Sequence, residues 1–136
     1  MTNEEYGRYV DALAPRSKTG KNLLNAFWVG GLICAIGQAL LNGYQALGLD
    51  ETTAGAAVSI SLVLLSAILT GFAVYDDIAK FAGAGTLVPI TGFANAVVAP
   101  AIEFQTEGFV LGTAAKMFTI AGPVIVYGLS ASVIYG

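Results

Sequence analysis

The residues best suited to chemistry lie in one glycine-rich run, FAGAGTLVPITGFAN. Its glycine density is that of a nucleotide loop, but it lacks the spacing of a dinucleotide fingerprint and the lysine of a phosphate loop. In a membrane the same composition fits a broken helix, in which free N–H groups at one half-helix end face anions and carbonyls at the other face cations. The run either lines a passage for a small anionic or ion-paired solute, or packs tightly with its hydroxyls satisfied.

Four carboxylates bracket this run: Asp76, Asp77, Glu103 and Glu107. Rings of carboxylates at pore mouths concentrate cations, and solvated loop charges are the alternative interpretation. The sequence does not show that any pair of them converges, so we assign no acid–base catalysis.

Several functional classes are excluded by composition. The chain has no histidine and one cysteine, so histidine-dependent nucleophiles, haem ligation by histidine and the usual histidine-bearing zinc sites are absent. We therefore predict no enzymatic activity, no cofactor and no metal. A net charge of −3 without a basic block argues against a nucleic-acid partner.

The elements that position these residues must lie in lipid. Of 136 residues, 56% are hydrophobic and 11% are charged, and no charge occurs in 22–49, 52–75 or 81–102. About 20 apolar residues span a hydrocarbon core of about 30 Å. We predict an all-α integral membrane protein with about four hydrophobic segments, made of a polar N-terminal segment, 1–21, and a membrane domain, 22–136.

The first two spans are predicted over about 22–47 and 54–75. The third apolar run, 78–101, is crowded by glycines and a proline, so we expect half-helices at about 77–83 and 91–99 with a non-helical stretch between them. Thr91 is a plausible cap for the second half. Irregular backbone at this depth must be buried in protein or line a cavity.

The last region has two interpretations. One long helix runs from 108 to 134 with Lys116 inside it, or a surface helix over 103–116 precedes a span over 117–136 and leaves Lys116 at the interface. At the other end, Tyr6, Tyr9, Val10 and Leu13 share a helical face. That segment is either a short helix on the membrane surface, with Asn3 as cap and Pro15 as stop, or a frayed tail.

Orientation follows from the basic residues. Arg16, Lys18 and Lys21 flank the first span, so the N-terminus is predicted to be cytoplasmic. Segment 103–107 lacks a basic residue, which favours a third run that crosses, giving four crossings with both ends cytoplasmic. A re-entrant run would instead place the carboxyl end outside.

Three stretches carry a family resemblance: AFWVGGLICAIGQALLN (26–42), LTGFAVYDDIAKFAGAGTLVPITGFANAVVAPAIEFQTEGFVLG (69–112) and AGPVIVYG (121–128). They resemble the small membrane subunits of the SpoVA family of spore-forming bacteria, over about 22–136. Of two related subunit types, the chain is more similar to the one with a basic N-terminal extension. Its carboxyl end lacks the tail that some members carry.

The resemblance implies a channel subunit in the spore inner membrane that moves dipicolinic acid, with calcium, during sporulation and germination. Implied partners are membrane lipid, copies of itself or the related membrane subunit, and soluble SpoVA proteins. The motif matches position by position, so the residues expected to line or shape the pore are Gly83, Gly85, Thr86, Pro89, Thr91, Gly92 and Asn95, with Lys116 as a further anion contact. The alternative is a non-conducting membrane scaffold that docks the soluble partners.

Overall fold

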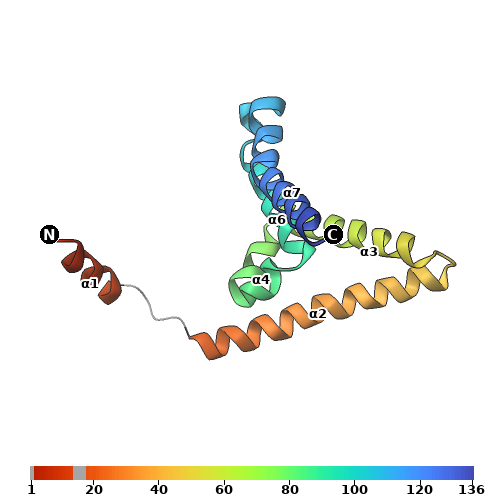
Figure 1. Ribbon diagram of the computed structural model, residues 1–136, viewed down its shortest axis with the longest axis horizontal. Helices are drawn as coiled ribbons and strands as arrows, with labels where there is room; N and C mark the ends of the chain where they lie inside the picture. Colours follow the sequence, from red (N-terminus) through yellow and green to blue (C-terminus); the bar gives the residue numbers. More distant parts are fainter. Residues whose placement is uncertain (1, 14–17) are drawn as a thin grey trace.

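A computed structural model describes residues 2–13 and 18–136, and every regular element in this part of the chain is helical (Figure 1). Three helical stretches, Thr19–Ala46, Glu51–Gly71 and Phe109–Tyr135, are long and apolar enough to cross a membrane, and Ile90–Glu103 is a shorter apolar helix. The all-α membrane class, with a broken third segment, is confirmed. In chain order the elements are α1 (Asn3–Leu13), α2 (Thr19–Ala46), α3 (Glu51–Gly71), α4 (Val74–Ala82), α5 (Ala84–Leu87), α6 (Ile90–Glu103), the 3₁₀ turn η1 (Gln105–Glu107), the π-helical turn η2 (Phe109–Ala114) and α7 (Ala115–Tyr135).

The N-terminal segment forms a helix, α1, whose cap differs from the prediction. The Glu5 N–H donates to the Thr2 hydroxyl at 3.3 Å, and the Thr2 N–H donates to the Glu5 carboxylate at 2.8 Å. This reciprocal pair is a capping box, so Thr2 rather than Asn3 caps the helix. The predicted stop at Pro15 and the basic Arg16 lie outside the described residues.

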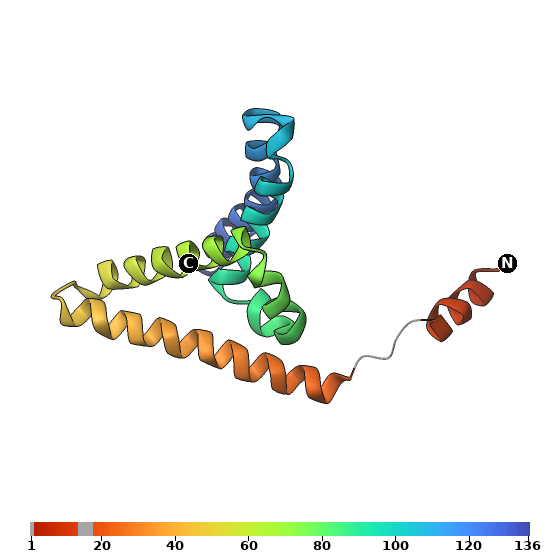
Figure 2. The same ribbon diagram turned by 180° about the vertical axis from the view of Figure 1, so that it is seen from behind.

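Helices α2 and α3 form an open hairpin that appears as a V in Figure 1. Asp50 caps α3 by accepting from the Thr53 N–H at 3.1 Å and from the Thr53 hydroxyl at 2.6 Å. Near the turn, the Tyr44 and Ser61 hydroxyls share a hydrogen bond of 2.7 Å. These contacts close the hairpin at its turn, while α4 and α5 occupy its open end (Figures 1 and 2).

The end of α3 comes earlier than predicted. Ala73 adopts a left-handed backbone conformation, with φ of 58°, and α3 stops at Gly71 instead of near residue 75. Tyr75 therefore belongs to α4, and its hydroxyl contacts Thr86 of α5 and Thr91 of α6. That segment comprises α4 and α6, which are longer than the predicted halves, and the expected non-helical stretch contains the single turn α5.

Helices α6 and α7 form a second hairpin, steeply inclined to α2 in Figure 1. Gly108, with φ of 100°, makes the turn, and a Cβ at Gly112 would overlap the Phe104 carbonyl oxygen. The chain is then continuously helical from Phe109 to Tyr135. The structure therefore agrees with the interpretation of one long helix, and residues 103–116 do not form a separate surface helix.

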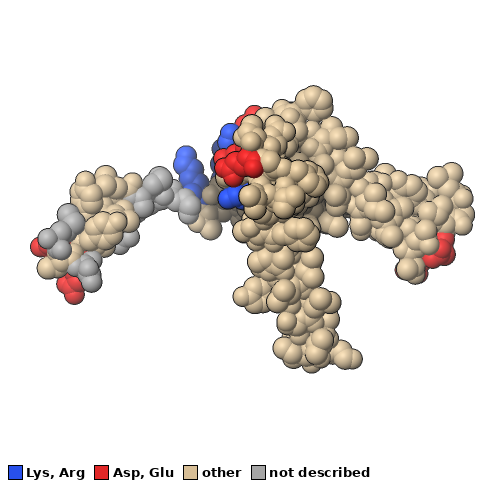
Figure 3. Space-filling model, turned by 90° about the horizontal axis from the view of Figure 1, so that it is seen from above, with Lys and Arg blue, Asp and Glu red and all other residues tan. Residues whose placement is uncertain are grey.

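Large apolar faces remain uncovered. The accessible surface is 10001 Å², whereas a compact soluble monomer of this mass exposes about 6,700 Å². Neither α2 nor α7 contains a buried residue. Figure 3 shows long stretches without charged side chains, with the charges gathered near helix ends. These faces suit contact with lipid or with further subunits.

Candidate functional site

The centre of the molecule is a hydrogen-bonded cluster built on Tyr75. Its hydroxyl donates to the Thr86 carbonyl oxygen at 2.9 Å and shares a hydrogen bond of 3.0 Å with the Thr91 hydroxyl. All three residues are at most 5% exposed. One phenol from α4 therefore joins α5 to the first turn of α6. Thr91 lies inside α6 rather than capping it, since the residue before the helix is Pro89.

Two hydroxyls of α3 complete this cluster. The Ser66 hydroxyl donates to the Thr91 carbonyl oxygen at 2.6 Å. The Thr70 hydroxyl lies 2.7 Å from the Ser66 carbonyl oxygen and 2.8 Å from Oδ1 of Asn95, so two acceptors compete for its single hydrogen. We call these residues the buried polar network, in which Thr70 and Asn95 are half-buried and the other four are buried: Ser66, Thr70, Tyr75, Thr86, Thr91 and Asn95.

The network also reports the direction of the chain. Ser66 pairs with Thr91 and Thr70 pairs with Asn95, so the partners advance by four residues on both helices. Helices α3 and α6 therefore run in the same direction where they touch. Helix α4 begins just after α3 ends at Gly71, at the open end of the α2–α3 hairpin. Because α6 runs parallel to α3, it brings the third segment back toward this same end.

Two predicted glycines lie where no side chain would fit. A Cβ at Gly85 would overlap the Ala26 carbonyl oxygen and come within 2.9 Å of the Ala26 Cα. A Cβ at Gly92 would overlap the Thr86 carbonyl oxygen and come within 2.5 Å of the Leu87 carbonyl oxygen. Glycine is therefore required for α5 to contact α2 and for α6 to begin beside α5.

Gly83 and Pro89 separate the short helices of the third segment. Gly83 has φ of 53° and ψ of −122°, which ends α4 and starts α5 in another direction. Pro89 has φ of −64° and ψ of 164°, an extended conformation that separates α5 from α6. The structure thus brings the whole predicted 83–95 motif into one compact unit.

Lys116 lies outside this unit. Its ammonium nitrogen sits 4.0 Å from the centroid of the Phe104 ring, a cation–π contact at the end of α6. The structure therefore places Lys116 beside the α6–α7 turn, away from the buried polar network.

Sequence reasoning missed Ser66, Thr70 and Tyr75. The available signal was the spacing of Ser66 and Thr70, whose hydroxyls are four residues apart and so lie on one helix face. Tyr75 gave no such signal, because its role depends on the break at Ala73.

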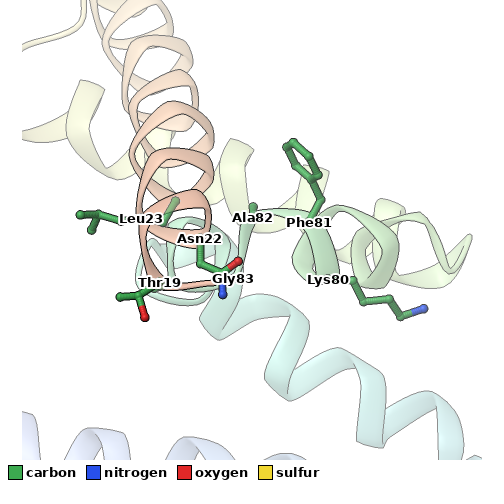
Figure 4. A pocket seen from close by; sticks show the side chains of 9 residues that line it. Thr19, Asn22, Leu23, Lys80, Phe81, Ala82 and Gly83 are labelled. Carbon is green, nitrogen blue, oxygen red and sulfur yellow. The ribbon is translucent and has the colours of Figure 1, made fainter. Parts of the chain in front are cut away.

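Two cavities flank the third segment. The terminal cavity, of about 390 Å³, is lined by Thr19, Asn22, Leu23 and Ala26 of α2 and by residues 80–84 (Figure 4). The central cavity, of about 190 Å³, is lined by apolar side chains of α2 and α3 and by Tyr75, Thr86 and Thr91. Figure 4 shows Asn22 and Gly83 facing one another, with the Lys80 side chain extending away.

Charged groups stay at the surface around these cavities. Lys80 pairs with Asp77 at 3.0 Å, and both side chains are more than three-quarters exposed. Within the described residues, no three histidine, cysteine, aspartate or glutamate side chains are arranged to hold a metal, and no buried side-chain polar atom lacks a hydrogen bond. The site consists of hydroxyls, an amide, carbonyls and glycine contacts. Such groups donate and accept hydrogen bonds without carrying a charge.

Comparison with known proteins agrees with the resemblance drawn from the motifs. Residues 22–136 match the family described as SpoVAC/SpoVAEB sporulation membrane protein. The chain is 50% identical over 139 residues to Stage V sporulation protein AC of Bacillus subtilis (strain 168), covering 100% of this chain and 93% of that protein. No solved structure matches it. On the strength of both matches, the chain belongs to the SpoVAC/SpoVAEB family of sporulation membrane proteins.

Proposed function

We propose that this protein is a subunit of a spore inner-membrane channel for dipicolinic acid, which moves with calcium into the developing spore and out during germination. The observation that carries the proposal is the buried polar network around the broken third segment. Uninterrupted apolar helices suffice to anchor a protein in lipid, whereas broken helices with polar groups at depth are the usual binding elements of membrane transport proteins.

The chemistry of the site supports a solute of this class. A dianion chelated to a divalent cation needs both donors and acceptors along its route. The segment 83–95 supplies threonine hydroxyls, the Asn95 amide and backbone groups at its two breaks, Gly83 and Pro89. We assign pathway roles to the motif residues and propose no catalytic residue and no cofactor.

One copy is too open to enclose a pore. The uncovered faces of α2 and α7 support assembly with copies of itself, with the related SpoVA membrane subunit, or with both, and lipid would cover what remains. We propose a cytoplasmic N-terminus, on the spore-core side, because Lys18 and Lys21 precede the apolar part of α2. Soluble SpoVA proteins would then bind at that side.

A second function is favoured by a different property of the same network. All of its side chains are hydrogen-bonded within the protein, and the central cavity is almost wholly apolar. A scaffold that conducts nothing and docks soluble SpoVA-type partners would need only such a packed core.

Release of dipicolinate from liposomes distinguishes the two functions. The protein would be reconstituted with and without its related subunit, and release measured under iso-osmotic conditions and after hypo-osmotic shock. A channel subunit gives protein-dependent release that changes with Pro89→Ala and not with Gly128→Ala, a site with open space around it. A protein that releases nothing under any condition, yet retains soluble partners, is a scaffold.

A further inference from the structure

The two cavities lie along one face of α2. Thr19, Asn22 and Ala26 line the terminal cavity, and Val29, Ile33 and Ile36 line the central one. These positions follow one another at spacings of three and four residues, which keeps them on one side of the helix. The cavities are therefore consecutive spaces along the same wall.

Three consecutive residues separate these spaces. Ala84 lines the terminal cavity, Thr86 lines the central cavity, and Gly85 between them presses its backbone against α2. A Cβ at Gly30 would lie 3.4 Å from both the Cα and the carbonyl oxygen of Gly85. The contact is thus backbone against backbone, and it lies between the two cavities.

The separating element is a single helical turn with a break on each side. Gly83 and Pro89 delimit α5, and within this turn the Thr86 hydroxyl donates to the Gly83 carbonyl oxygen at 3.0 Å. Tyr75 of α4 holds α5 in place, because its hydroxyl donates to the Thr86 carbonyl oxygen. A short turn held by a phenol and a glycine contact can move without unfolding a long helix.

We propose that α5 is the gate of this protein, and that opening lifts Gly85 from Ala26 and Gly30 so that the terminal and central cavities join. This proposal rests on the proposed channel function. It assigns the structure, with α5 against α2, to the closed state of that channel. The apolar lining of the central cavity adds a second barrier while α5 is seated, since narrow apolar spaces exclude water and ions.

A size series at Gly30 tests the gate against a matched control. Gly30→Ala brings a Cβ to van der Waals contact with Gly85, and Gly30→Val adds two methyl groups that press on it. Gly31→Ala and Gly31→Val change the neighbouring position, where a Cβ meets nothing within 4 Å. Each full-length variant would be reconstituted with the related subunit in dipicolinate-loaded liposomes. We expect the iso-osmotic leak to increase along the Gly30 series, reaching about tenfold, which corresponds to about 1.4 kcal/mol. The Gly31 series should match the wild type.

A second pair of variants removes the phenol without adding bulk. Tyr75→Phe deletes the hydrogen bond to α5, while Tyr127→Phe alters an exposed phenol of α7. The gate predicts a raised leak for the first change only, with both proteins still monodisperse in detergent. If the wild type releases solute after shock but the resting leak is the same in all variants, the gate is wrong while the channel stands. If neither wild type nor variants release solute, both proposals fail.

Discussion

The third segment, Val74–Glu103, and the last helix, α7, are both apolar, yet they are built on different principles. The third segment is broken twice, contains seven buried residues and makes hydrogen bonds to α3 through Ser66 and Thr70. Helix α7 runs unbroken through Pro123, has no buried residue and packs mainly on α6 and η2.

The difference shows where the specificity of the fold resides. In lipid, apolar side chains gain little by leaving one apolar environment for another, so close backbone contacts and hydrogen bonds determine which helices pair. The third segment has both kinds of contact. Helix α7 has the composition for lipid or for another subunit, and substitutions should affect the two regions very differently.

The largest difference is expected for one added methyl group. Gly92→Ala would force α6 away from the Thr86 and Leu87 carbonyl oxygens, and overpacking of this kind costs about 1–3 kcal/mol or more. Gly128→Ala in α7 meets nothing within 4 Å and should be neutral within about 0.5 kcal/mol. Thermal unfolding in detergent would measure both, and equal stabilities would contradict the comparison.

A smaller difference is expected for the two phenols. Tyr75→Phe removes the donor to the Thr86 carbonyl oxygen and leaves the Thr91 hydroxyl without this partner, at a cost of about 1–3 kcal/mol. Tyr127 is 77% exposed, and Tyr127→Phe should leave stability unchanged. Denaturant unfolding of both variants beside the wild type would measure these changes in stability. A Tyr75→Phe protein as stable as the wild type would show that the network contributes little.

The α3–α6 contact should give a still smaller effect. Thr70→Val removes the hydroxyl bonded to Asn95, and interhelical hydrogen bonds in membranes contribute about 0.6 kcal/mol on average. Thr119→Val in α7 removes only a bond to the Ala115 carbonyl oxygen of its own helix. A double variant with Asn95→Leu should cost less than the sum of the single changes, and strict additivity would mean that the pair is uncoupled.

The smallest effect on stability is expected at the α2–α3 turn, and only at acidic pH. The hydrogen bonds from Thr53 hold the pKa of Asp50 below its usual value near 3.8. A lowered folded-state pKa stabilises the fold above the unfolded-state pKa, and this contribution disappears as the pH falls through the folded-state value. Asp50→Asn should therefore make the free energy of unfolding less dependent on pH below pH 3.8, while the stability at neutral pH stays nearly the same. An unchanged acid limb in titrated thermal melts would exclude this role.

Much of the fold follows from the sequence. Charge-free runs predicted the spans, and Gly83 and Pro89 predicted the breaks, because these two residues act on their own backbone. Gly85 and Gly92 lie inside helices, and their roles depend on contacts with other elements. The ends of elements were less predictable. The stop of α3 depends on Ala73 adopting a left-handed conformation, which no residue type at that position signals.

The partners of the polar groups could not be predicted. The sequence singled out Thr86, Thr91 and Asn95 as residues that line or shape the pore, but it did not indicate their bonds to Ser66, Thr70 and Tyr75, which cross between helices. Such pairing depends on how far α3 extends and on the direction of α6. Lys116 shows the same limit, since its contact with Phe104 arises only from the tight α6–α7 turn.

Thiol accessibility at Thr86 tests the central claim most directly, that solute passes beside the third segment. In a Cys34→Ala background, Thr86→Cys would be treated with a membrane-impermeant thiol reagent in liposomes at rest and during dipicolinate release, with Val126→Cys in α7 as the control. We predict that Thr86→Cys reacts only during release and that Val126→Cys reacts in neither state. Release that proceeds while Thr86→Cys stays unreactive would contradict the account, because the solute would then take another route.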